Sequence, residues 1–196
     1  MSNHTSRIVA DMAMSVDGYI SDADGSSEAL FGFYFGGDVE VETATPGMPF
    51  KAPAPSAQVL RDGMSSVGAL VYGRRSSDLA KAWGGRHPMG VPVFVVTHRP
   101  QPAEGDVTFV TEGVERAVEL AVEAAAGRTV GIASPSITRQ CLDLGLLDAI
   151  HVNLVPVLLG GGTPWFAELE TWPVRLEDPE IVASSGVTHL AYRVAR

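Results

Sequence analysis

The sequence predicts an α/β protein with a central, mostly parallel sheet that is flanked by helices. Short apolar runs alternate with stretches of helical periodicity along much of the chain, which is typical of this class. Residues 129–145 show the unit most clearly, because an apolar run, a polar turn and a helical repeat follow one another there. Residues 174–184 and 187–194 have the pattern of two closing strands joined at Ser185-Gly186, so we expect an antiparallel end to the sheet.

Composition limits the classes of function. The chain has 196 residues, 45% of them hydrophobic, which is enough for one core, so we expect a single domain. A net charge of −9 opposes a broad surface for nucleic acid or anionic membranes. The single cysteine, Cys141, fits a reducing compartment and lies between apolar positions, which indicates a core residue. The N-terminus lacks a signal-peptide pattern and no apolar run reaches the roughly 18 residues of a membrane span. We therefore predict a cytoplasmic protein.

Residues Ile8–Ser15 are mostly apolar and predict a first strand inside the sheet. This strand leads into Asp17-Gly18, a pair that strongly favours a turn. A carboxylate at the end of a central strand is also a common active-site position in α/β proteins. From the residues alone both interpretations stay open, and a plain turn is the more frequent use of the pair.

Residues 21–56 are the least regular part of the chain. Four aromatic residues fall within residues 31–35, and an acidic, proline-rich stretch follows them. Because aromatic side chains are costly to leave in water, we expect this cluster to cover a pocket, a partner subunit or the body of the domain. A connection of this length is typical of a lid, a dimer contact or a partly disordered segment.

The next two strands end in groups that suit anion binding. A helical stretch over 56–66 precedes a buried strand at 68–72, and a second apolar strand covers 91–96. Gly73, Arg74, Arg75 and Ser76 follow the first strand, and Thr97, His98 and Arg99 follow the second. Guanidinium and hydroxyl donors at strand ends suit phosphate oxygens, although a solvated basic corner is the plain alternative. No paired carboxylate is visible to tune His98 as a catalytic acid or base, so ligand binding or exposure is favoured.

The turn Ala133-Ser134-Pro135-Ser136 begins a helix. A short strand at 108–110 and a helix with an apolar stripe at 113–126 precede it. Ser134 suits the N-cap of the new helix, Pro135 suits its first position, and Ser136 adds a second hydroxyl. Helix N-termini attract phosphate, although most of them bind nothing.

The predicted strand at 149–159 enters the sheet and runs into Gly160-Gly161-Gly162. Glycines there allow positive φ angles and let the backbone come close to a strand or a ligand. His151 lies in the strand and is interpreted as a hydrogen-bonded sheet residue. Trp83, Trp165 and Phe166 either border a flat substrate or pack in the core.

The sequence lacks the motifs of several enzyme classes. The nucleophile elbow, the Walker loop, the glycine-rich dinucleotide fingerprint and the zinc-protease helix are all missing. The histidines lack metal-ligand spacing, so we expect no metal site. They are His4, His87, His98, His151 and His189.

Four motifs together resemble one known family. They are residues 14–20 (MSVDGYI), 71–75 (VYGRR), 96–100 (VTHRP) and 155–163 (VPVLLGGGT). In this combination and order they resemble the dihydrofolate-reductase-like family, in the branch related to the C-terminal reductase domain of the riboflavin pathway's bifunctional deaminase-reductase. The resemblance spans nearly the whole chain. It implies one dihydrofolate-reductase-like domain over 1–196, with an irregular insertion at about 21–56.

The resemblance implies an enzyme that binds NADPH across the strand ends and transfers hydride to a pteridine-like or other conjugated heterocyclic or carbonyl substrate. It also implies a set of cofactor-binding residues. These are Gly73, Arg74, Arg75, Ser76, Thr97, His98, Arg99, Ala133, Ser134, Pro135, Ser136, Ile137 and Gly161. An arginine near the 2′-phosphate would favour NADPH over NADH.

The substrate side of the site follows from the same resemblance. Met14, Tyr19, Trp83 and Phe166 are the expected substrate-binding residues, and Asp17 is the expected catalytic residue. Asp17 lies on a loop that closes over nicotinamide and substrate in this family. Its role is then proton supply, substrate hydrogen bonding or loop geometry. The expected partners are a small-molecule substrate and a second copy in a homodimer.

One departure from the family pattern opens a second hypothesis. Where relatives carry Gly-Gly before the helix, this chain has Ala133-Ser134 followed by Pro135. Two side chains and a proline take away room and one N–H donor beside the pyrophosphate. The chain is therefore either an NADPH-dependent reductase or a relative that binds a small molecule, or acts on one, without the cofactor. A third, structural reading takes the aromatic segment simply as a dimer interface.

Overall fold

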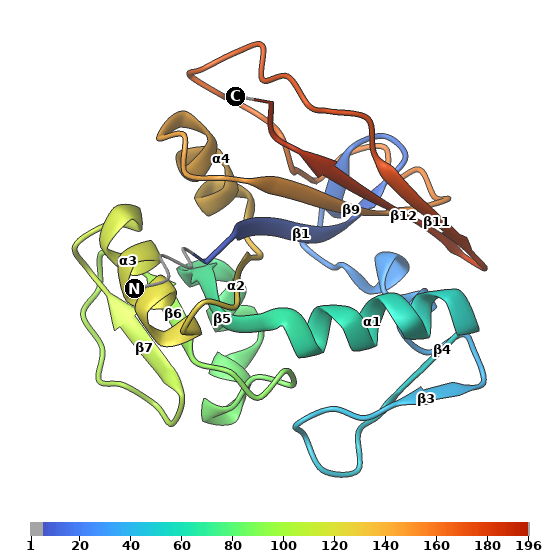
Figure 1. Cartoon of the computed structure of the whole chain (residues 1–196), viewed down its shortest axis with the longest axis horizontal. Helices are drawn as coiled ribbons and strands as arrows, with labels where there is room; N and C mark the ends of the chain where they lie inside the picture. Colours follow the sequence, from blue (N-terminus) through green and yellow to red (C-terminus); the bar gives the residue numbers. More distant parts are fainter. Residues whose placement is uncertain (1–5, 196) are drawn as a thin grey trace.

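An eight-stranded sheet forms the centre of the protein (Figure 1). The computed structural model describes residues 6–195. Between its edges the sheet contains β11 (Glu180–Ser184), β12 (Val187–Arg193), β9 (Ala149–Val155), β1 (Ile8–Ser15), β8 (Thr129–Ile132), β5 (Val67–Gly73), β6 (Val93–Val96) and β7 (Val107–Val110), in this order. All neighbours from β9 to β7 are parallel, whereas β12 pairs antiparallel with β9 and β11. The predicted fold class is confirmed.

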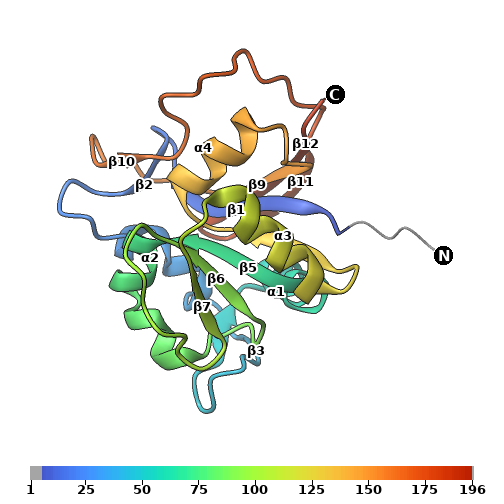
Figure 2. The same cartoon turned by 90° about the vertical axis from the view of Figure 1, so that its left-hand side faces the viewer.

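Helices cover both faces of this sheet (Figure 2). The first face carries α3 (Val114–Ala125) and α4 (Pro135–Asp143), whose apolar sides form one core with the strands. The opposite face carries α1 (Ala54–Ser66), and α2 (Arg74–Leu79) leaves the end of β5. Since side chains alternate along a strand, Ala10 and Met12 of β1 join the first core, and the residue between them faces α1.

The irregular segment after β1 is folded onto the α1 face. It contains β2 (Tyr19–Ser21), two short 3₁₀ turns and a hairpin of β3 (Val39–Val41) with β4 (Phe50–Ala52). In the turns Leu30 and Phe33 are buried against β1, β9 and β12. The aromatic cluster therefore covers the body of the protein through Phe33 and a pocket through Phe31 and Tyr34, which are two of the three alternatives proposed from the sequence.

Some element boundaries differ from the prediction. The helix predicted at 56–66 already begins at Ala54, because Pro55 suits the first turn. The strand predicted to continue to 159 ends at Val155, since Pro156 has no N–H group for the ladder. The strand predicted from 174 pairs with β12 only from Glu180 onward. Within residues 6–195 no helix is long and apolar enough to cross a membrane, and the cytoplasmic location stays a prediction.

The glycine triplet packs against backbone. Gly162 has φ +126°, and a Cβ there would collide with the carbonyl groups of Ser21 and Asp22. This close approach lets β10 (Thr163–Pro164) pair with β2. The predicted close approach to a strand is therefore confirmed, and the predicted approach to a ligand stays a prediction.

Candidate functional site

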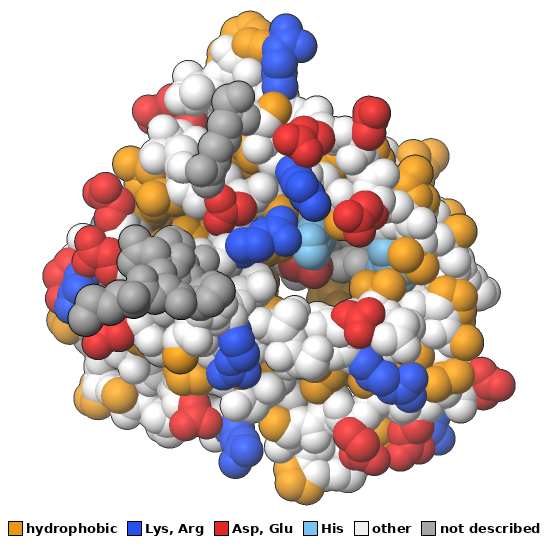
Figure 3. All heavy atoms as spheres, in the orientation of Figure 1, with side chains coloured by type: hydrophobic (Ala, Val, Ile, Leu, Met, Phe, Trp, Pro, Cys, Tyr) orange, Lys and Arg blue, Asp and Glu red, His pale blue; other side chains and the backbone are white. Residues whose placement is uncertain are grey.

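Two cavities adjoin on the α1 face of the sheet. The larger, about 690 Å³, lies beside the carboxyl ends of β5 and β8, and we name it the strand-end cavity. The smaller, about 360 Å³, lies between α1 and the sheet, and we name it the aromatic pocket. Figure 3 shows this face hollowed between α1 and the strands β1 and β9. Five residues line both cavities: Asp11, Phe31, Tyr34, Tyr72 and Ala133.

Ser134 closes the inner wall of the strand-end cavity. Its side chain is buried, and its hydroxyl oxygen accepts the Gly73 N–H at 2.8 Å and lies 2.9 Å from the Ser76 hydroxyl. It stands at the N-cap position of α4 but makes no side-chain hydrogen bond to that helix. The predicted helix start is therefore correct, while the hydroxyl binds the neighbouring turn. Ser134 and Ser136 both pack at 3.4 Å from where a Cβ on Gly73 would lie.

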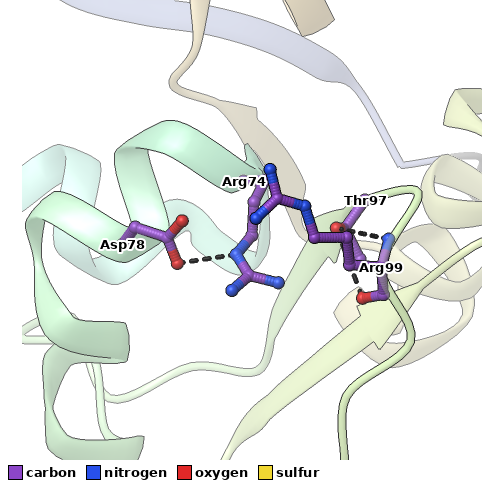
Figure 4. Close-up of polar contacts among 4 residues, drawn as sticks. All are labelled: Arg74, Asp78, Thr97 and Arg99. Atoms are coloured by element: carbon purple, nitrogen blue, oxygen red, sulfur yellow. Dashed lines mark hydrogen bonds and ion pairs between the residues drawn. The ribbon is translucent and has the colours of Figure 1, made fainter.

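The cationic groups lie at two adjacent strand ends. Parallel pairing of Gly73 with Val96 brings the residues after β5 and β6 together. Arg74 forms an ion pair with Asp78 at 2.6 Å, and its guanidinium carbon lies 5.8 Å from the centre of the Phe109 ring. At the second strand end the Thr97 hydroxyl accepts the Arg99 N–H at 3.1 Å, as Figure 4 shows.

The structure brings together about half of the predicted site residues. Gly73, Arg74, Arg75, Ser76, Trp83, Ala133, Ser134, Pro135 and Ser136 line the strand-end cavity. The others do not line either of the two cavities: Met14, Asp17, Tyr19, Thr97, His98, Arg99, Ile137, Gly161 and Phe166. Ile137 is buried in the core, Met14 packs against the same core, and Phe166 stacks on the buried Trp165.

Asp17 shapes a turn. Its carboxylate accepts the Ser15 hydroxyl at 2.6 Å, the Gly160 N–H at 2.7 Å and the Leu159 N–H at 3.1 Å. The Ser15 hydrogen bond, together with the two backbone bonds, holds the pKa of Asp17 below its usual value. Of the three roles considered for Asp17, these contacts match loop geometry.

A buried chain of hydrogen bonds leads to Asp11. A carboxylate accepts hydrogen bonds, so Asn153 presents its Nδ2 donor to Asp11 Oδ1 at 2.7 Å. The Asn153 oxygen then faces His189 Nδ1 at 2.6 Å, and that nitrogen carries the ring proton. Burial lowers the pKa of His189, which favours the neutral ring, and Nε2 accepts the Ser56 hydroxyl at 2.8 Å. In this series of hydrogen bonds, every donor therefore points toward Asp11.

The sheet explains this arrangement. Asn153 lies opposite Ala13 on β1 and opposite His189 on β12, so it bridges two neighbouring strands on the α1 face. His151, the register partner of Asp11, places Nδ1 3.6 Å from Asp11 Oδ2. Hence His151 lies in a strand as predicted, but its ring nitrogen is beyond hydrogen-bond distance of Asp11.

Tyr72 and His87 form a second polar pair at the junction of the cavities. Burial lowers the pKa of His87 to about 4, so the ring is neutral at pH 7. The Met89 N–H donates to Nδ1 at 3.2 Å, which leaves the proton on Nε2 to donate to the Tyr72 oxygen at 3.2 Å. The Tyr72 hydroxyl hydrogen is not used in that bond. Burial, reinforced by the charge of Asp11, raises the pKa of Tyr72, so its hydroxyl stays protonated.

Trp83 reaches the site through an unusual turn. Lys81, Ala82 and Trp83 have φ angles of 49°, 46° and 52°, in the left-handed region that residues with a Cβ rarely adopt. The turn holds the centre of a Trp83 ring 4.6 Å from the centre of the Tyr72 ring and 4.9 Å from the centre of the His87 ring. Trp83 thus packs against a core cluster and also lines the strand-end cavity, so contact with a flat ligand stays a prediction.

Sequence reasoning missed Asp11, Tyr72, Asn153 and His189. One signal was available, because Asp11 is a charged residue inside an otherwise apolar strand. The others become functional candidates only through strand pairing. Among residues 6–195 no group of three His, Cys, Asp or Glu side chains could hold a metal ion, and His4 lies outside that range.

Comparisons with known proteins agree on one family. The family model of the RibD C-terminal domain matches residues 6–190. A solved protein named for riboflavin biosynthesis, from Shewanella sp. PV-4, is 26% identical with a TM-score of 0.69, over 97% of this chain and 99% of that one. No curated protein sequence matches the chain.

Two further solved structures share the fold. The diaminohydroxyphosphoribosylaminopyrimidine deaminase/5-amino-6-(5-phosphoribosylamino)uracil reductase of Thermotoga maritima is 13% identical with a TM-score of 0.62, over 97% of this chain and 57% of that one. Dihydrofolate reductase from Enterococcus faecalis, solved with NADP(H), is 16% identical with a TM-score of 0.56, over 97% of each chain.

Proposed function

The chain belongs to the RibD C-terminal domain family, and from this premise we propose that it is an NADPH-dependent reductase that transfers hydride to a small pteridine-like or other conjugated heterocyclic or carbonyl substrate. A reductase-type function is what the family and the dihydrofolate reductase neighbour support. The finer statement, with NADPH as donor and a conjugated ring or carbonyl compound as acceptor, is our proposal.

The observation that carries the proposal is the pair of adjoining cavities. Hydride transfer needs two ligands whose reacting atoms touch, with water excluded. The strand-end cavity contains two arginines, whereas the described lining of the aromatic pocket has neither lysine nor arginine, and the two cavities share a floor around Asp11, Tyr34 and Tyr72. A dinucleotide in the first and an acceptor in the second would meet over that floor.

The residues present fit a phosphorylated dinucleotide. Arg74 and Arg75 line the strand-end cavity together with the hydroxyls of Ser76, Ser134 and Ser136. Guanidinium groups and hydroxyls are suitable donors to phosphate oxygens. When bound there, NADPH supplies hydride from its nicotinamide ring.

The protein's own residues orient the acceptor and exclude water. Phe31, Tyr34 and Phe50 wall the aromatic pocket. The Tyr72 oxygen accepts a hydrogen bond from His87, so the Tyr72 hydroxyl hydrogen is left to donate. Because Tyr72 borders both cavities, this hydroxyl would donate to a carbonyl oxygen or ring nitrogen of the acceptor. These roles are positioning and solvent exclusion rather than bond making.

The test is a titration with NADPH, followed by nicotinamide fluorescence, with NADH as comparison. We expect NADPH to bind more tightly than NADH, and we expect Arg74→Ala to lower the affinity for NADPH at least tenfold. Arg99→Ala tests whether the second strand end reaches the 2′-phosphate. Arg116→Ala is the matched control, because Arg116 is a surface arginine of α3 paired with Glu119. Absence of NADPH binding up to millimolar concentration would refute the proposal.

A second candidate function rests on Ser134. Its hydroxyl already accepts the Gly73 N–H, a donor that a pyrophosphate would otherwise use. If that bond persists, the chain binds a small molecule, or acts on one, without a dinucleotide. The same titration distinguishes the two functions, since this second one predicts no NADPH binding in any variant.

We also propose that the protein forms a homodimer through the outer edge of β11. This strand ends the sheet and exposes Ile181 and Val182, by 61% and 38%. Edge strands with apolar side chains favour pairing with another strand. Light scattering should give the mass of a dimer for the wild type and of a monomer for Ile181→Lys. A wild-type monomer at high micromolar concentration would exclude this proposal.

A further inference from the structure

We propose that His189 is a positioning residue: through Asn153 it fixes Asp11 as a hydrogen-bond acceptor, and the charge of Asp11 in turn selects the tautomer of the His189 ring. This inference rests on the proposed function in one respect, because it takes the floor around Asp11 as part of a ligand site. His189 and Ser56 line neither of the two cavities, so they would act on a ligand only through Asn153 and Asp11.

The three residues behind Asp11 are shielded from solvent. The exposed fractions of Ser56, His189 and Asn153 are 0%, 6% and 7%. Buried polar groups need partners inside the protein, so these residues must satisfy one another. The Phe33 ring packs against the imidazole of His189, with 5.7 Å between the ring centres and an angle of 78° between the rings. The imidazole is thus confined, and what can vary is which of its nitrogens carries the proton.

Two directions of hydrogen bonding are possible in such a series. An asparagine amide can present its oxygen or its nitrogen to a given neighbour, and a neutral imidazole carries its proton on either nitrogen. The Ser56 hydroxyl can donate or accept, so it adapts to both directions. A carboxylate only accepts, so Asp11 requires the Asn153 nitrogen and leaves the amide oxygen to His189 Nδ1–H. The charge of Asp11 therefore selects the direction of the whole series.

The distances support a series that is ordered from its charged end. Asn153 Nδ2 lies 2.7 Å from Asp11 Oδ1, and His189 Nδ1 lies 2.6 Å from the Asn153 oxygen. Both are shorter than the roughly 2.9 Å that is usual for an N–H···O hydrogen bond. Short bonds are typical where one partner is charged, and such a bond polarises the next one in a network. Since 51% of the Asp11 side chain is exposed, the orientation set from behind is presented to both cavities.

Other titratable groups surround Asp11 without replacing Asn153. His151 Nδ1 lies 3.6 Å from Asp11 Oδ2, which is beyond hydrogen-bond distance and concerns the other carboxylate oxygen. Tyr34 and Tyr72 border the same cavities, and burial raises the pKa of both, so they are uncharged at pH 7. The oxygen that faces the interior is therefore positioned by Asn153.

Nitrogen-15 NMR of the protein labelled at histidine tests the inference, because the chemical shifts of the two ring nitrogens reveal which one carries the proton. His189→Gln identifies the signals of His189 by their loss. In the wild type at pH 7 we expect the Nδ1–H tautomer, although the Nε2–H tautomer predominates in free neutral histidine.

Variants at the two ends of the series show which end selects the tautomer. Asp11→Asn removes the charge and lets position 11 donate as well as accept, so we expect the ratio of Nδ1–H to Nε2–H forms to fall about tenfold. Ser56→Ala should keep the Nδ1–H form dominant, because the selecting charge is at the other end. Asp106→Asn is the matched control, since it changes an exposed carboxylate outside the two cavities and should leave the ratio unchanged.

Every other outcome counts against the inference. A dominant Nε2–H tautomer or a doubly protonated ring in the wild type would overturn it, and this measurement needs no variant that could fail to fold. An unchanged ratio in Asp11→Asn, or loss of the Nδ1–H form in Ser56→Ala, would overturn it as well. A merely structural role of His189 would not make its tautomer follow the charge at position 11. Since NADPH is left out, failure of the cofactor to bind would refute the proposed function without deciding this result.

Discussion

The strand-end cavity and the aromatic pocket share a floor but are assembled differently. The first takes its polar groups from residues that directly follow β5 and β8, such as Arg74 and Ser134. The second takes Asp11 and Asn153 from strand interiors and its apolar walls from α1 and the segment before it. The proposed anion-binding groups thus lie in local motifs, whereas the proposed acceptor pocket exists only in the tertiary structure.

Asn153→Ala should destabilise the protein most, by about 3 kcal/mol. The substitution removes buried volume, and it takes away the hydrogen-bond acceptor of His189 Nδ1 and the hydrogen-bond donor to Asp11. Urea unfolding measures the change in the free energy of unfolding. The exposed His98→Ala serves as control, with a change within about 0.5 kcal/mol. A loss below about 1 kcal/mol for Asn153→Ala would mean that the chain of hydrogen bonds is not formed as described.

Acidification should destabilise the pocket through His87. Its ordinary pKa is 6.5 and the folded value is about 4, so the unfolded chain binds the proton first as the pH falls. Stability is therefore full above pH 6.5 and is lost between pH 6.5 and 4. At roughly 1.4 kcal/mol per pKa unit, the loss from His87 is about 3 kcal/mol.

The pH dependence of unfolding in His87→Gln isolates this contribution. The variant should lose less stability than the wild type over the same pH range, while His98→Gln should follow the wild type. Parallel curves for the wild type and His87→Gln would show that His87 is not a buried neutral ring.

Ser134→Ala should have a smaller effect, about 1 kcal/mol. It deprives the Gly73 N–H of its acceptor, but the cavity lets water replace the hydroxyl. Thermal unfolding measures the loss, and the surface change Ser65→Ala provides the comparison. A loss as large as that of Asn153→Ala would remove the contrast between the two cavities.

Arg74→Ala should change stability least, by less than about 0.5 kcal/mol. Its ion pair with Asp78 is at the surface, where such pairs contribute little. The same variant is expected to lose NADPH affinity, so binding and stability separate at this residue. A large loss of stability would instead assign Arg74 a structural role.

The contrast also explains how much the sequence could predict. The fold class followed from periodicity, and the strand-end residues followed from their places directly after strands, as for Gly73 and Ser134. Asp17 illustrates the limit, because its type and position are typical of an active site and its carboxylate binds the Gly160 turn. Asn153 and His189 lie 36 positions apart and meet only because β9 pairs with β12. No local pattern encodes such a pair.

Binding of two ligands in two adjoining cavities can be tested by a titration with NADPH in the presence of saturating 2-aminobenzimidazole, a flat heterocycle small enough for the aromatic pocket. We expect a ternary complex, in which the apparent Kd for NADPH does not rise in proportion to the concentration of the heterocycle. Mutual exclusion of the two ligands, with the apparent Kd rising in that proportion, would contradict it.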